Sequence, residues 1–128
     1  MGLARCSQCG HEMIFDGISQ DDPRGPQAYF RCSNCEQSAN VGRDGAGGMA
    51  LVNLYPTPTS AKGYHEFADY QAGEKAMFAA MRVDAGWMST AEFAEWSEEL
   101  RVSVERYKAE HPLPRSLWRR LSDRGSGE

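Results

Sequence analysis

The chain has 128 residues and a formal net charge of -4, with 41% hydrophobic and 25% charged residues. This composition is typical of a folded globular protein and excludes an intrinsically disordered one, and the length fits one domain or two small lobes. No stretch approaches the roughly 18 apolar residues of a membrane-spanning helix, and the N-terminus lacks the apolar core of a secretory signal. We therefore expect a cytoplasmic protein that does not enter a membrane.

All four cysteines lie in the first 35 residues, as two Cys-x-x-Cys pairs separated by 22 residues. Each pair can form a tight turn, here called a knuckle, that aims two sulfurs at one ion, and four thiolates make up the tetrahedral shell of a structural Zn²⁺ site. The sequence therefore predicts zinc as the cofactor, with Cys6, Cys9, Cys32 and Cys35 as its ligands. Since these four complete the shell, we expect His11 to be a polar knuckle residue.

Other chemistries of a four-cysteine set stay open. Four thiolates also hold iron–sulfur clusters, and disulfides would form in an oxidising compartment. A thioredoxin-like redox centre needs one exposed pair at the start of a helix, and a catalytic zinc ion keeps an open position, usually beside a His or carboxylate ligand. Two symmetric pairs that supply four sulfurs favour a closed, structural site.

Short runs with alternating apolar character at residues 12–15, 28–31 and 38–41 predict a small antiparallel sheet, with a turn-rich hairpin tip at 16–27. Knuckles that open onto such strands resemble the zinc-ribbon family, over about residues 4–42. The resemblance implies the ribbon fold and the four cysteine ligands, but no single function, because zinc ribbons contact nucleic acids, dock proteins or simply staple a fold. More distantly, the paired knuckles resemble the Com-type phage regulators, which bind RNA.

A glycine-rich run and a strand-like run follow the second knuckle. Residues 42–48 lack the G-x-x-x-x-G-K-[ST] pattern of a phosphate-binding loop, so we expect a flexible connector there. Residues 49–55 have the length and composition of a strand that ends at Pro56. The ribbon with this strand would occupy residues 1–55.

The period of the apolar residues becomes helical from Ser60 onward, and Gly73 leaves open whether one broken helix or two short helices follow. Ser89 and Glu92 form a capping-box pattern before a second helix. Its apolar stripe has helical spacing and consists of Phe93, Trp96, Leu100, Val104 and Tyr107. We expect a helical hairpin that turns at residues 84–88.

Two prolines, Pro112 and Pro114, end this helix, and residues 115–122 can form a short amphipathic helix. Its apolar side would carry Leu117, Trp118 and Leu121. The predicted class is therefore α+β, with an N-terminal four-cysteine zinc ribbon, a helical unit over residues 60–122 and a flexible tail over 123–128.

Two or three helices cannot cover all of their own apolar faces, so either the ribbon or another chain must cover them. Met and Trp suit binding surfaces because they adapt to and anchor interfaces, although the same side chains also build cores. We expect a protein partner or self-association. The candidate partner-binding residues are Trp87, Trp96, Trp118, Glu95 and Glu99.

Nucleic-acid binding is the alternative function. Residues 61–111 carry ten acidic against six Lys or Arg side chains, so the broad basic excess of such proteins is absent. The candidate contacts are Arg5, Arg31, Arg115, Arg119 and Arg120.

Catalytic motifs are not indicated, because His65 and His111 lie far apart in the sequence and the adjacent Glu98 and Glu99 point in different directions on a helix. No small-molecule substrate is indicated either. We expect a non-enzymatic zinc protein whose ribbon supports a helical interaction surface. By analogy, phages and mobile elements use small proteins of this kind to modulate host complexes.

Overall fold

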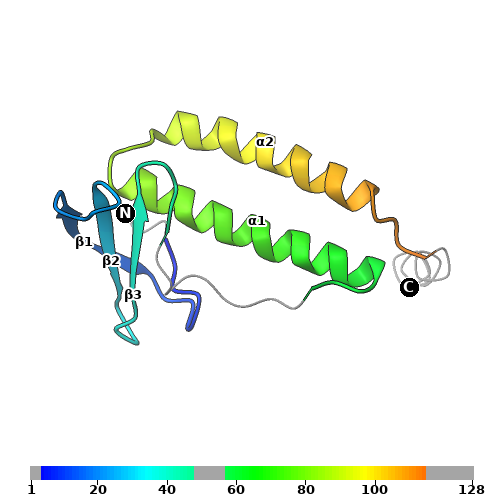
Figure 1. The fold of residues 1–128 in the computed structure, drawn as a ribbon, viewed down its shortest axis with the longest axis horizontal. Coiled ribbons are helices and arrows are strands. Elements are labelled where there is room, and N and C mark those ends of the chain that lie inside the picture. Colours follow the sequence, from blue (N-terminus) through cyan, green and yellow to red (C-terminus); the bar gives the residue numbers. More distant parts are fainter. Residues whose placement is uncertain (1–3, 48–56, 115–128) are drawn as a thin grey trace, which may run out of the picture.

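The structure, a computed structural model, describes residues 4–47 and 57–114 (Figure 1). Its elements are β1 (Met13–Ser19), β2 (Gln27–Cys32), β3 (Ser38–Gly42), α1 (Ala61–Asp84) and α2 (Thr90–Ala109). A three-stranded sheet followed by two helices confirms the predicted α+β class. The strand expected at 49–55, the helix expected at 115–122 and the tail at 123–128 lie outside the described residues.

The sheet is antiparallel, with the order β1-β2-β3. Side chains alternate between the two faces of a strand, and on β2 the core face carries Ala28, Phe30 and Cys32, all buried. Tyr29 therefore points to the other face. On β1 the register shifts between Phe15 and Gly17, which is the signature of a β-bulge. The three strands form at the predicted runs, but β1 continues through residues 16–19, which were expected in the hairpin tip.

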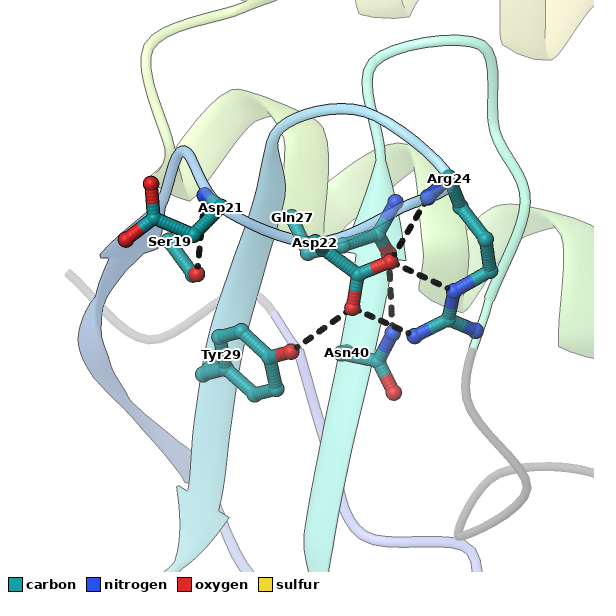
Figure 2. Close-up of polar contacts among 7 residues, drawn as sticks. All are labelled: Ser19, Asp21, Asp22, Arg24, Gln27, Tyr29 and Asn40. Atoms are coloured by element: carbon teal, nitrogen blue, oxygen red, sulfur yellow. Dashed lines mark hydrogen bonds and ion pairs between the residues drawn. The ribbon is translucent and has the colours of Figure 1, made fainter.

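The hairpin tip between β1 and β2 is organised by one carboxylate (Figure 2). Asp22 accepts hydrogen bonds from the backbone N–H and the guanidinium of Arg24 at 2.9–3.1 Å and from the hydroxyl of Tyr29 at 3.2 Å. The Arg24 hydrogen bonds hold the pKa of Asp22 well below its usual range. Beneath the tip, the buried Gln27 accepts a 2.8 Å hydrogen bond from Asn40. The turn-rich tip thus has a defined polar structure.

Helix α1 is one continuous helix of 24 residues, so both alternatives that the sequence left open at Gly73, one broken helix and two short helices, are wrong. It begins at Ser60, whose hydroxyl accepts the N–H of Gly63 at 3.1 Å. A glycine inside a helix costs about 1 kcal/mol relative to alanine. Packing against both the sheet and α2 outweighs this cost, because tertiary contacts supply most of the stability of a helix in a protein.

Helix α2 begins at the predicted capping box. The hydroxyl of Ser89 accepts the N–H of Glu92 at 3.0 Å, and the Glu92 carboxylate accepts the N–H of Ser89 at 3.1 Å. The backbone N–H of Ser89 lowers the pKa of Glu92. The two helices lie side by side as the expected hairpin (Figure 1). Neither has the length and apolar character that crossing a bilayer requires.

The ribbon and α1 share one core. Its buried members are Ala4, Cys6, Met13, Ala28, Phe30, Cys32, Ala39, Val41 and Met81, and Met77, Phe78, Ala85 and Trp87 pack against them. Since Met81 lies in the last two turns of α1, the ribbon covers this end of the helix. The ribbon therefore supplies part of the cover that the helices lack on their own.

The glycine-rich run differs from the flexible connector that we expected over residues 42–48. Its described part turns tightly, with a 2.9 Å hydrogen bond from the Gly45 N–H to the Gly42 carbonyl and a bridge between Val41 and Gly47. A side chain at Gly47 would collide with the ring of Phe78 on α1. Glycine is needed here because the turn packs directly on the helix.

Candidate metal centre

The four cysteine sulfurs lie within 4.8 Å of one another. Three of the Sγ–Sγ distances are 3.6 Å for Cys6–Cys35, 3.3 Å for Cys9–Cys32 and 3.6 Å for Cys9–Cys35. A tetrahedral ion with metal–sulfur bonds of about 2.3 Å separates its ligands by about 3.8 Å. These distances fit such a shell and are far longer than a disulfide bond, which is about 2.05 Å. The four cysteines are thus positioned to chelate one metal ion.

The two knuckles are built alike. The backbone N–H of Cys6 donates to the carbonyl of His11 at 2.8 Å, and the backbone N–H of Cys32 donates to the carbonyl of Gln37, also at 2.8 Å. In both cases the acceptor lies five residues after the first cysteine of the pair. These hydrogen bonds fold each Cys-x-x-Cys segment back on itself, so that its two sulfurs point to one side.

Backbone N–H groups also point at the sulfurs. Gln8 donates to Cys6 Sγ at 3.4 Å, and Asn34 donates to Cys32 Sγ at 3.3 Å, each from two residues further along the chain. Partial positive charge beside a sulfur favours its thiolate form, which is the form that binds metal. The backbone therefore prepares both knuckles for a cation.

A left-handed residue follows the second cysteine of each knuckle. Gly10 has φ 76° and Glu36 has φ 62°, and Glu36 is the one non-glycine residue with positive φ among the described residues. This conformation was not predicted at Glu36 from the sequence. The equivalent positions in the two pairs were the signal that could have revealed it.

The pKa values of two of the thiols shift in opposite directions. The backbone N–H of His11 lowers the pKa of Cys9 to about 6, with smaller effects from neighbouring side chains that include His11 itself. At Cys35 the backbone N–H of Gln37 acts in the same sense, but desolvation and the three other thiols outweigh it and raise the pKa to about 12. Desolvation and the neighbouring thiols thus oppose ionisation of Cys35, whereas the N–H of His11 favours ionisation of Cys9.

Burial differs within each pair. Cys6 and Cys32 are both 2% exposed and belong to the core, whereas Cys9 is partly buried and Cys35 is exposed. The first cysteine of each pair would thus link a bound ion to the core, and the second is the more exposed of the two. Among the described residues, no other group of His, Cys, Asp or Glu side chains is close enough to hold a metal.

The candidate partner-binding residues lie in different environments. Glu95 and Glu99 are exposed on α2, and Trp96 is half-buried, with its ring centroid 6.0 Å from that of Phe93. Trp87 packs against the ribbon core, with the guanidinium of Arg43 5.7 Å from the centroid of its ring. Part of the Trp87 side chain therefore packs within the chain and is not available to a partner.

The candidate nucleic-acid contacts are only partly within the described residues. Arg5 donates its backbone N–H to Met77 Sδ at 2.9 Å and a guanidinium N–H to the carbonyl of Gly10 at 3.3 Å. It thereby links the first knuckle to α1. Arg31 is exposed and points away from the core, because its neighbours Phe30 and Cys32 point into it. Trp118, Arg115, Arg119 and Arg120 lie outside the described residues.

Two histidines that are distant in sequence meet at the open end of the hairpin. His65 Nε2 lies 2.7 Å from the carbonyl oxygen of His111 and 3.2 Å from that of Lys108, and the ring of His111 stacks on Tyr64 with a centroid separation of 4.0 Å. A ring N–H that donates to the last carbonyls of a helix caps its C-terminus. Both histidines therefore hold the helices together.

Comparison of this chain with protein-family models, with curated proteins and with solved structures gave no match. The similarity to zinc ribbons therefore rests on the ligand spacing, the paired knuckles and the three-stranded sheet.

Proposed function

We propose that this protein is a non-enzymatic zinc-binding interaction protein. In this proposal, Zn²⁺ stabilises the fold of the ribbon, and the ribbon packs against α1. The helical hairpin then presents α2 to a protein partner or to a second copy of the chain. The metal and the interaction surface are separate parts of the proposal, and each has its own support and its own test.

Zinc is supported by the donor set. All four ligands are sulfurs at tetrahedral spacing, and Zn²⁺ takes such a set without a preference for other geometries. Backbone N–H groups favour the thiolate forms of Cys6 and Cys32. Protein purified without added metal should contain one equivalent of zinc and release it when the thiols are titrated with a mercurial. A brown iron chromophore, or four reactive thiols without zinc, would contradict the assignment.

The observation that carries the interaction proposal is the exposure of α2. This helix has 20 residues, its N-terminus is capped, and none of its side chains is buried, whereas α1 buries Ala68, Ala79, Ala80 and Met81. An amphipathic helix needs a second surface against its apolar stripe. Trp96, with Glu95 and Glu99 nearby on the same helix, supplies an aromatic anchor and acidic groups for a partner.

The described side chains give less support to catalysis. Four cysteine ligands leave no position for a metal-bound water, and the ring nitrogens of His65 and His111 contact backbone carbonyls. Binding is therefore the activity that the arrangement favours.

Charge reversal on α2 tests the interaction. We expect a chain carrying Glu95→Lys and Glu99→Lys to lose a partner captured from the native host, or to lose self-association in sedimentation, because both carboxylates are exposed. The matched control is Glu66→Lys, which makes the same kind of change on α1 and should leave binding unchanged. Capture that is equal in all three proteins would contradict an α2 interface.

Nucleic-acid binding remains the second proposal, and the exposure of Arg31 on the outer sheet face is the observation that favours it. If it holds, retention on RNA or DNA should fall steeply as salt rises, because each phosphate contact releases counterions. Arg31→Gln should then weaken binding for all sequences alike. An absence of binding at low salt would reject this alternative.

A further inference from the structure

A continuous apolar groove runs between the two helices on one side of the hairpin. Its larger part, 480 Å³, is lined on α1 by small residues and on α2 by longer ones. Gly73 and Ala76 also line a second hollow of 250 Å³, which reaches Arg5 of the ribbon. The lining of the larger part consists of Ala72, Gly73, Ala76, Ser97, Leu100, Arg101, Val104, Glu105 and Lys108.

The floor of this groove is open. A Cβ atom added at Gly73 would meet no atom within 4 Å, and Leu100 and Val104 are only half-buried. At the C-terminal end of α2 the groove is bounded by an ion pair of 2.7 Å between Lys108 and Asp69. The floor thus lacks large side chains from α1, and an amphipathic segment could fill the space.

The chain itself supplies such a segment at the correct place. Residues 115–122 follow Pro114, which lies five residues after α2 ends, and as a helix they would carry Leu117, Trp118 and Leu121 on one side. Eight helical residues extend for about 12 Å, which matches the run of α2 from Lys108 back to Leu100. Helices this short are marginal in water, so a helix here would need a surface to pack on.

The charges are complementary. Glu98 and Glu105 share a single cation, Arg101, at 2.6 and 2.7 Å, which leaves this rim of the groove with an excess of one negative charge. Residues 115–122 contain three arginines and no acidic residue. If the segment is helical, its spacing places Arg115 on one flank of the apolar side, Arg120 on the other and Arg119 opposite to it.

We propose that residues 115–122 dock in this groove as a third helix, antiparallel to α2, with Leu117, Trp118 and Leu121 packed over Gly73, Leu100 and Val104. The docking does not depend on a partner. The effect of the docking on a partner does rest on the proposed function. The segment would cover one flank of the hairpin and leave the face with Glu95 and Glu99 free.

Nuclear Overhauser contacts in the zinc-loaded chain of 128 residues test the docking. We expect contacts between the Trp118 indole, assigned with Trp118→Phe, and the methyl groups of Leu100 and Val104. Gly73→Met should abolish them, because its side chain would extend into the groove from a position where a Cβ atom meets nothing within 4 Å. Gly73→Ala is the matched control: it makes the same gain in helix propensity but leaves most of the groove open, so the contacts should persist.

Samples that mix isotope-labelled and unlabelled chains identify the source of the contacts. Contacts within one chain, independent of concentration, support the proposal. Contacts only between chains would assign the groove to a second copy, and a solvent-exposed Trp118 without such contacts would leave the groove to another occupant. Either result overturns docking within the chain. Neither affects the proposed interface at Glu95 and Glu99, whose charge-reversal test has a separate readout.

Discussion

The ribbon and helix α2 belong to the same chain, but they are stabilised in different ways. The ribbon packs Met13, Phe30 and Val41 almost completely out of solvent around its two inner cysteines, together with Met81 of α1. Helix α2 buries none of its residues and is held by its capping box, by side-chain ion pairs and by its contact with α1. The ribbon thus belongs to a buried core, whereas the side chains of α2 are exposed or only half-buried.

Loss of the metal should have the largest effect and should fall on the ribbon. Zinc binding contributes about 10–16 kcal/mol to the folding of small zinc domains, so Cys32→Ser should unfold the strands. Helix α2 has no residue in the ribbon core and should lose less amide-exchange protection than the strands do. Hydrogen exchange followed by NMR measures both regions in one sample.

The control for Cys32→Ser is Asn34→Ser, which keeps the backbone N–H that points at Cys32 Sγ and should leave the fold intact. Equal loss of protection in the strands and in α2 would show that the two regions form one cooperative unit. That result would contradict the view that the ribbon and α2 are stabilised in different ways.

Replacement of one phenylalanine by alanine in each region should show the difference in burial between the ribbon and α2. Phe30 is 1% exposed, and Phe30→Ala should cost about 3–5 kcal/mol of unfolding free energy because it leaves a cavity in the core. Phe93 on α2 is only half-buried, so Phe93→Ala should cost about 1 kcal/mol, since little apolar area returns to water. Urea unfolding of the zinc-loaded proteins gives both values, and similar losses would contradict the different burial of the two regions.

The sequence predicted those features that depend on local patterns. The spacing of the four cysteines indicated the metal ligands, the alternation around Phe30 indicated β2, and the pairing of Ser89 with Glu92 located the start of α2. Each of these signals lies within a few residues or in a repeated motif, and each corresponds to a hydrogen bond or a buried face in the structure.

Features that depend on packing between distant segments were not predictable. The continuity of α1 through Gly73 depends on the ribbon and α2, and the meeting of His65 with the end of α2 joins residues 43 and 46 positions apart. The prediction of a flexible connector is wrong at Gly47, because the close contact of this turn with Phe78 exists only in the folded chain. Glycine alone does not distinguish a flexible residue from a tightly packed one.

The first knuckle should be sensitive to a side chain at its left-handed position. Gly10 has φ 76°, and a Cβ atom there meets nothing within 4 Å, so the effect of Gly10→Ala isolates backbone strain. We expect a loss of about 1–2 kcal/mol, because the left-handed conformation is unfavourable for an L-residue with a side chain. Chemical denaturation of the zinc-loaded variant measures it, and an unchanged midpoint would mean that the knuckle relaxes to another backbone conformation.

A smaller effect is expected at the start of α2. Ser89→Ala should destabilise this helix by about 1 kcal/mol, and Ser103→Ala, an exposed change further along α2, should have little effect. Ser89→Ala keeps the backbone N–H that lowers the pKa of Glu92, so this pKa should stay below its ordinary value. Because that pKa is lowered in the folded protein, its contribution to stability is present above the ordinary value and is lost as the pH falls through the folded value. Carboxyl NMR titration checks the lowered pKa, and an ordinary value in the unsubstituted protein would argue against the capping box.

The smallest expected change is a gain of stability at the second knuckle. Glu36 occupies the position of Gly10 with φ 62°, so Glu36→Gly removes the strain of a side chain in the left-handed region. Glycine also gives the unfolded chain more freedom, which offsets part of the gain and limits it to about 1 kcal/mol or less. The gain should appear as a higher denaturation midpoint of the zinc-loaded protein, with α2 unaffected in hydrogen exchange. A loss of stability would instead show that the Glu36 side chain makes a favourable contribution that exceeds its strain.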